Sequence, residues 1–201
     1  MFLYNNKVVT SNSITRAGVI PYTIENNRLY FLMGIDRKTR ELTDFGGGAK
    51  SNESMVQAGF RELAEESCEI FTGHITMKNL LSSPAIINDT KSAIIFFCKV
   101  EPFWLNCAEE NFIQNQRLLC NASKHNELIG IKWIEQHYFK TIAFNRKNQC
   151  MWKRVQNIIR SSTNWNELRM ALLIGAEIKS VMSNPLFANN INIYPNNIIV
   201  Q

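Results

Sequence analysis

Three glutamates, Glu62, Glu65 and Glu66, lie close together in a stretch whose apolar residues have helical spacing. On a helix that turns ~100° per residue, the three acids share one arc and the apolar residues another. Like charges at this spacing repel by a few tenths of a kcal/mol per exposed pair, and by more where they are partly buried. We therefore expect a cation among them, because carboxylate oxygens are the ligands that Mg²⁺ prefers. The apolar arc consists of Val56, Phe60 and Leu63.

Three consecutive glycines, Gly46, Gly47 and Gly48, precede the acidic stretch. Glycine lets a backbone bend sharply and approach a ligand closely, so we expect a carbonyl or amide of this loop to take part in binding. Divalent ions held by carboxylates could bind a diphosphate and help to activate water. The alternative is an ordinary solvated acidic helix face, which is common in proteins.

The elements that position these residues follow from periodicity and turn residues. The acidic helix is predicted to begin at Glu53, with Ser51 or Asn52 as its N-cap. Strands are predicted on both sides of it, the first two forming a hairpin, and a polar, helix-like segment precedes the last strand. Two further helices are predicted near the end of the chain. The strands cover residues 17–22, 29–35, 92–100 and 127–135, the polar segment 108–125, and the two late helices 148–160 and 165–179.

Composition restricts the class of protein. The chain has 201 residues, 22 basic and 17 acidic side chains, and a formal charge of +5, which favours a polyanionic partner as well as it fits ordinary solubilising charge. Its apolar runs are far shorter than the ~20 residues of a membrane span, and no signal peptide is predicted. The five cysteines are widely spaced. We therefore expect reduced thiols and a cytoplasmic protein.

The order of the acidic stretch resembles the signature of the Nudix hydrolase family, G-x5-E-x7-R-E-U-x-E-E-x-G-U, in which U is a bulky aliphatic residue. Cys68 stands at the place of the closing glycine and Glu69 at the place of the last aliphatic, so the helix exit is expected to differ, with Ile70 or Phe71 supplying the apolar contact. The matching residues, in order, are Gly47, Glu53, Arg61, Glu62, Leu63, Glu65 and Glu66.

The resemblance implies cleavage of a nucleoside diphosphate linked to another group, by attack of water on phosphorus. It implies that Glu62, Glu65 and Glu66 bind Mg²⁺ or Mn²⁺ together with the carbonyl of Gly46. Glu66 or Glu65 would also polarise the attacking water. Family members often use a further glutamate from a later loop, for which Glu127 is the first candidate. Glu109 and Glu110 are the second candidates.

Other residues near the signature are assigned supporting roles. Glu53 and Arg61 look like the pair that braces loop against helix, and we expect a partly buried ion pair between them. The residues predicted to contact the substrate, chiefly its phosphates, are Lys50, Arg16, Arg37 and Gly47.

The fold that the resemblance implies is α+β, an α/β/α sandwich with a mixed sheet, a central catalytic helix and added C-terminal helices. We expect a Nudix domain over residues 1–145, a helical extension over 146–184 and an Asn-rich tail over 185–201. The oligomeric state is open, since family members occur as monomers and dimers.

The nature of the substrate has three readings. The first is the 5′ cap of mRNA, favoured by the basic balance, by the length of the chain and by a basic late helix that could hold RNA phosphates. The layout also resembles Nudix proteins of large DNA viruses, some of which decap RNA. The second is a small nucleotide, such as a nucleotide sugar, dinucleoside polyphosphate or damaged dNTP. The third is a non-catalytic nucleotide- or RNA-binding module. The intact carboxylates of this chain argue against a non-catalytic module.

Overall fold

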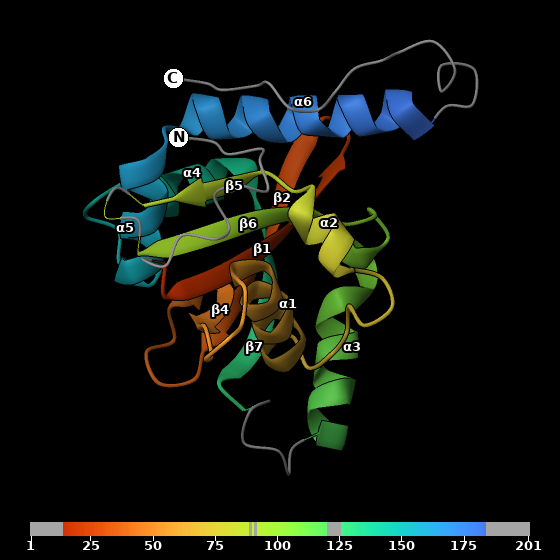
Figure 1. Cartoon of the computed structure of the whole chain (residues 1–201), viewed down its shortest axis with the longest axis vertical. Helices are drawn as coiled ribbons and strands as arrows, with labels where there is room; N and C mark the ends of the chain where they lie inside the picture. The colour runs from red at the N-terminus through yellow and green to blue at the C-terminus, as the bar shows by residue number, and fades with distance from the viewer. Residues whose placement is uncertain (1–13, 89, 91, 120–125, 184–201) are drawn as a thin grey trace.

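The computed structural model describes residues 14–88, 90, 92–119 and 126–183. These residues form one seven-stranded mixed sheet with helices packed on both of its faces (Figure 1). The strands are β1 (Arg16–Glu25), β2 (Arg28–Asp36), β3 (Leu42–Thr43), β4 (Phe45–Gly48), β5 (Ala85–Ile87), β6 (Ala93–Lys99) and β7 (Leu128–Glu135). The helices are α1 (Met55–Glu66), α2 (Met77–Leu81), α3 (Trp104–Leu119), α4 (Gln136–Phe144), α5 (Lys153–Ser162) and α6 (Trp165–Ser183).

Strand β1 lies at the centre of the sheet, whose order is β3-β2-β1-β6-β5. Its second half pairs antiparallel with β2, and it runs parallel to β6. Its first half also pairs antiparallel with β4, the glycine strand, while β7 pairs with β2. The parallel pairing of β1 with β6 among antiparallel pairings makes the sheet mixed, as predicted.

Side chains alternate between the two faces of the sheet with the period of two that strands impose. Along β1, Ala17 and Val19 belong to one apolar cluster, whereas Ile20 and Tyr22 belong to the other. The first cluster includes buried residues of α1, α2 and α3, and the second includes those of α4, α5 and α6. The predicted α+β class, with helices on two sides of a sheet, is therefore confirmed.

The acidic helix begins later than predicted. Ser54 is its N-cap, so the assignment of Ser51 or Asn52 was wrong. The Ser54 hydroxyl accepts a hydrogen bond from the backbone N–H of Gln57 at 3.2 Å, and the Gln57 side chain accepts one from the N–H of Ser54 at 2.8 Å. This reciprocal capping box satisfies the backbone N–H groups of Ser54 and Gln57 at once. Ser51 and Asn52 do not form these bonds because they lie before the first turn of the helix.

The chain leaves α1 through the two positions that depart from the signature, Cys68 and Glu69. Cys68 has φ 52° and Glu69 has φ 61°, both in the left-handed region where glycine carries no steric penalty. The chain nevertheless makes the turn with non-glycine residues. Cys68, Ile70 and Phe71 are all buried in the first apolar cluster, so apolar contacts offset some of the backbone strain.

The remaining elements follow the sequence closely, with additions. The β1–β2 hairpin forms, with Asn26 and Asn27 at positive φ in its turn, and β6 and β7 lie inside their predicted ranges. Helices α2 and α4 and the short strands β3 and β5 were not predicted. Two predicted segments lie at least partly outside the described residues. They are residues 120–125 of the polar helix-like segment and the whole tail over 185–201.

Helices α5 and α6 pack directly on the sheet. Val155 and Ile159 of α5, together with Leu168 and Leu172 of α6, lie in the same apolar cluster as residues of β1, β2 and β6. Within the described residues, no helix has the length and apolar character that a membrane crossing requires. Cys107 and Cys150 are free thiols, and Cys120 lies outside the described residues.

Candidate active site

The three glycines form a strand and do not bend. Gly46 pairs with Gly18 and Gly47 pairs with Ala17 of β1, so the expectation of a sharply bent loop was wrong. Glycine is needed here because other groups come very close. A Cβ atom on Gly46 would lie 2.5 Å from the Cα of Gly18, and one on Gly47 would lie 2.5 Å from the Glu62 carboxylate. The missing side chain of Gly47 therefore lets the acidic helix approach the sheet, and that of Gly46 lets β4 lie close to β1.

Glu66 connects this helix to the glycine strand. Its Oε2 accepts a hydrogen bond from the backbone N–H of Gly46 at 2.7 Å, and only 7% of the residue is exposed. Burial raises the pKa of Glu66 well above its usual range, and the negative charge of Asp44 raises it further, against the effect of the Gly46 N–H. A buried acid with further acids around it favours the arrival of a cation.

Arg16 and Asp44 support the glycine strand from within the protein. The guanidinium donates to both carboxylate oxygens, at 2.8 and 2.6 Å, and to the carbonyl of Gly46 at 3.1 Å. Arg16 is 2% exposed and Asp44 is 0% exposed. Burial alone would lower the pKa of Arg16, but the adjacent Asp44 carboxylate raises it overall. The predicted contact between Arg16 and substrate phosphate stays a prediction, and the structure directs the donors of Arg16 inward, to Asp44 and Gly46.

Arg61 lies among the acids of the signature. Its Nε donates to Glu53 at 2.8 Å, and its Nη2 donates to Glu53 at 2.9 Å and to the Gly48 carbonyl at 2.9 Å. Its Nη1 donates to Glu62 at 2.6 Å and to Glu65 at 3.2 Å. The bond from Arg61 is the largest influence on the pKa of Glu53 and lowers it, whereas burial is the largest influence on that of Glu62 and raises it. Arg61 thus ties the loop, the strand and two of the predicted metal ligands together.

The carboxylates of Glu62, Glu65 and Glu66 are the donors that could hold a divalent cation. Among the described residues, no three Asp, Glu, His or Cys side chains are gathered into a ready-made metal cluster. The Arg61 guanidinium supplies positive charge between Glu62 and Glu65. The available donors are nevertheless oxygens of partly or fully buried acids, which suits Mg²⁺ or Mn²⁺. The chemistry of the set fits, provided that Glu62 and Glu65 exchange Arg61 for the ion.

Glu127 lies on the segment just before β7 and within electrostatic reach of this cluster. After burial, which dominates, its charge is among the causes that raise the pKa of Glu62 and Glu66. Arg37 holds the same segment by donating from Nε to the carbonyl of Asn126 at 2.7 Å. The carboxylates of Glu109 and Glu110 accept hydrogen bonds elsewhere on the surface, from the Trp133 N–H and the Gln114 side chain.

The remaining candidate, Lys50, is exposed, and its backbone N–H donates to Glu53 at 2.9 Å. Its side chain remains a predicted phosphate contact. Sequence reasoning missed Asp44, which holds Arg16. The available signal was an acid directly before Phe45 and the three glycines.

The two glycines give a matched pair of predictions. Gly46→Ala places its Cβ against backbone atoms of β1, at 2.5 and 2.7 Å, so we expect a loss of about 3 kcal/mol of folding stability. Gly47→Ala meets only the movable end of Glu62. It should cost under about 1 kcal/mol yet lower activity by roughly tenfold or more. Thermal unfolding and hydrolysis assays check both; equal effects of the two variants on stability would contradict this geometry.

Comparisons with known proteins were made on the sequence and on the fold. No model of a protein family matches the sequence, and no curated protein matches it. Among solved structures, a MutT/nudix family protein from Enterococcus faecalis is 14% identical, with a TM-score of 0.39 over 61% of this chain. The match spans 44% of that protein, less than half of its length.

Two further solved structures are similar over more of the chain. A binary complex of the C. elegans Ap4A hydrolase is 16% identical, with a TM-score of 0.42 over 80% of this chain and 98% of that one. The Bacillus subtilis pyrophosphohydrolase BsRppH is 13% identical, with a TM-score of 0.42 over 89% and 90%. Similarities at these TM-scores do not show the function of this chain.

Proposed function

We propose that this protein is a Nudix-type hydrolase that cleaves the diphosphate bond of a nucleoside diphosphate linked to another group, with Mg²⁺ or Mn²⁺. One observation carries the proposal: six of the seven signature positions fall on α1 and β4, the seventh, Glu53, lies in the loop between them, and their own functional groups join the three segments. The carboxylate of Glu66 is bonded to the N–H of Gly46, that of Glu62 lies against Gly47, and Arg61 bonds the Gly48 carbonyl.

The metal would be held by Glu62, Glu65 and Glu66, with the Gly46 carbonyl, which also accepts a hydrogen bond from Arg16, as a further ligand. When bound, a divalent ion neutralises charge on the diphosphate and lowers the pKa of bound water. Arg61 would keep three hydrogen bonds, two to Glu53 and one to the Gly48 carbonyl, after Glu62 and Glu65 turn to the ion. The helix would therefore stay braced when its acids change partner.

The chain supplies the proton acceptor and the orientation for the reaction. Water attacks phosphorus, a new phosphorus–oxygen bond forms, and the bond from the same phosphorus to the bridging oxygen breaks. A carboxylate takes the proton of the water, either from the helix, at Glu66 or Glu65, or from Glu127. Lys50, which is exposed beside the glycine strand, would contact a phosphate of the leaving group.

We place the catalytic unit within residues 1–145 and treat 146–184 as an extension of a cytoplasmic enzyme. The substrate that we favour is the capped 5′ end of an RNA, in accord with the formal charge of +5. The alternative is a small nucleotide. A non-catalytic binding module has little need for the intact carboxylates.

The experiment that tests this function separates the readings. The protein is incubated with cap-labelled RNA and, separately, with a panel of free nucleotides, in Mg²⁺, Mn²⁺ or EDTA. Release of label from RNA, competed by uncapped RNA but not by free cap analogue, is the expected result. Turnover of free nucleotides alone would replace the RNA substrate with a small one. Binding without any cleavage would overturn the enzymatic proposal.

A further inference from the structure

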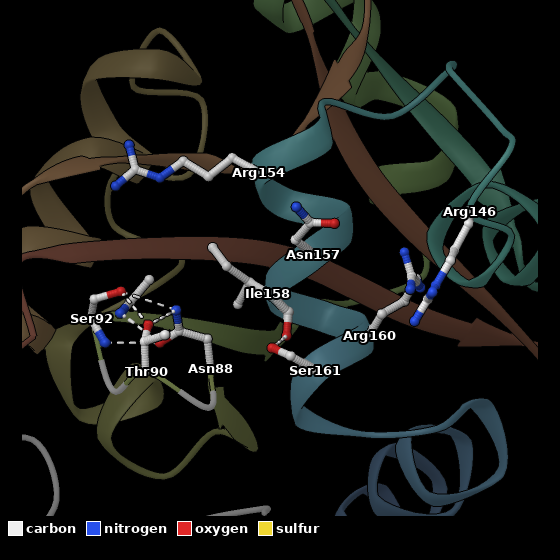
Figure 2. Close-up of a pocket in the computed structure, with 10 residues that line it drawn as sticks. Asn88, Thr90, Ser92, Arg146, Arg154, Asn157, Ile158, Arg160 and Ser161 are labelled. Carbon is white, nitrogen blue, oxygen red and sulfur yellow. Dashed lines mark hydrogen bonds between the residues drawn. The ribbon is translucent and has the colours of Figure 1, made fainter.

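A cavity of about 630 Å³ opens beside α5, away from the carboxylates of α1 (Figure 2). One wall is the exposed side of α5 and the other is formed by residues 88, 90 and 92, between β5 and β6. Ile158 and Ala93 contribute apolar surface to it. Its size is within the range of ligand-binding pockets, and the signature does not account for it.

Three arginines, Arg146, Arg154 and Arg160, line this cavity, which we call the arginine pocket. Figure 2 shows Arg146 and Arg160 extending toward one another on one side of α5, while Arg154 extends away from the helix on the other side. The described lining residues include no Asp or Glu, and the ion pairs formed by the described residues do not involve these arginines. Several guanidinium groups around one pocket, with no ion pair among the described residues, favour a ligand with several anionic groups, and their planar donors suit phosphate.

The polar wall opposite α5 is held in place by its own hydrogen bonds. The Asn88 side chain donates to Thr90 Oγ1 at 2.7 Å and to Ser92 Oγ at 3.0 Å, and its Oδ1 accepts from the N–H of Ser92 at 2.8 Å. Hydroxyls fixed in this way are suitable partners for phosphate oxygens. The described lining has no aromatic ring on which a base could stack. This chemistry recognises a phosphate backbone rather than a nucleobase.

The arginine pocket lies at the same end of the sheet as the carboxylate site. Thr15 donates its N–H to the carbonyl of Ser92, and its own carbonyl accepts from the N–H of Ala49, both at 3.0 Å. In the strand register, Arg16 is opposite Ala93 on one side and Gly48 on the other. With strands about 4.8 Å apart, the backbones at Ala93 and Gly48 are separated by roughly 10 Å, a distance that a short stretch of single-stranded RNA would span.

We propose that the arginine pocket binds the backbone phosphates of an RNA chain whose 5′ end lies at the carboxylate site. The RNA passes around the end of β1, because the two sites lie near opposite faces of the sheet. This inference rests on the proposed function and gives it a substrate class, a polynucleotide.

The test measures binding of a 20-nucleotide, 3′-labelled single-stranded RNA to the full chain by fluorescence anisotropy. Divalent ions are removed with EDTA, so the measurement does not depend on catalysis. In Arg154→Ala/Arg160→Ala, Kd should rise by about tenfold or more at 0.1 M salt. The slope of log K against log salt should become shallower by about 0.7 for each lost contact, or roughly 1.4 in all.

A matched control removes two positive charges outside the pocket, in Arg28→Ala/Lys140→Ala, where both residues are exposed. This variant should bind the RNA within about twofold of the wild type. Equal weakening by both variants would mean that net charge alone holds RNA and would overturn the proposal, as would unchanged binding in the pocket variant. A second probe, ADP, distinguishes the source of phosphate: loss of ADP binding with RNA binding intact would overturn the RNA assignment.

Discussion

Glu66→Gln should lower Mg²⁺-dependent hydrolysis by at least about 100-fold, the scale on which loss of one electrostatic group at a reacting centre is felt. Gln has the shape of Glu, and its amide oxygen can still accept the hydrogen bond that Gly46 donates to Glu66. What it loses is the negative charge that we assign to the metal. The measurement is kcat on the substrate that the wild type cleaves, at saturating Mg²⁺.

The same substitution should leave the protein at least as stable as the wild type. Glu66 is buried beside other acids, and burial raises its pKa well above the usual range, so a neutral side chain removes an unfavourable charge. Glu25→Gln, at the exposed end of the β1–β2 hairpin, is the control and should change neither property. Wild-type activity in Glu66→Gln would remove the metal-site assignment. Lost activity accompanied by unfolding would leave it without support.

Arg16→Met should destabilise the protein by about 3–5 kcal/mol, since it leaves the Asp44 carboxylate buried without its partner. Asp44 is 0% exposed and would retain only a long hydrogen bond of 3.3 Å from the Thr43 hydroxyl. For a chain of this size the melting temperature should fall by roughly 10 °C. Chemical denaturation of the two proteins measures the difference in free energy of unfolding.

Two further variants show whether the effect arises from the buried pair. Arg28→Met removes an exposed arginine and should change stability by less than about 0.5 kcal/mol. Arg16→Met/Asp44→Leu removes both charges and should be more stable than Arg16→Met alone. A cost below 1 kcal/mol for Arg16→Met would contradict the structural role and favour the predicted phosphate contact.

The central helix and the main strands could be predicted from the sequence because their signals are local. Val56, Phe60 and Leu63 mark one face of α1 by spacing alone. The apolar run of β6 likewise needs no knowledge of its partners. The N-cap was placed wrongly because Ser51, Asn52 and Ser54 are all good caps. Only the reciprocal bonds with Gln57 select Ser54.

The glycines and Arg16 show what sequence could not predict. A bend was predicted at Gly46 and Gly47 because glycine is common in turns. Glycine is required at these positions because β1 and the Glu62 carboxylate lie very close, and the sequence does not show where those groups lie. A phosphate contact was predicted for Arg16 because it lies near the end of a predicted strand. Its partner, Asp44, lies 28 residues away, and pairing at that distance is decided by the sheet.

The arginine pocket was foreseen only as a basic late helix. Arg154 and Arg160 stand on α5, but Arg146 precedes the helix and the polar wall comes from residues near β6. Periodicity within α5 reports its buried face, which includes Val155 and Ile159. It says nothing of which distant segment lies opposite the exposed face.

The most direct test is the binding of Mn²⁺ to the chelator-treated full chain, followed by the loss of the electron paramagnetic resonance signal of the free ion. If Glu62, Glu65 and Glu66 can exchange the Arg61 guanidinium for a divalent ion, the wild-type protein removes this signal on titration and Glu66→Gln does so much more weakly. A wild-type protein that leaves Mn²⁺ free at millimolar concentration, with and without a nucleoside diphosphate, would contradict the account.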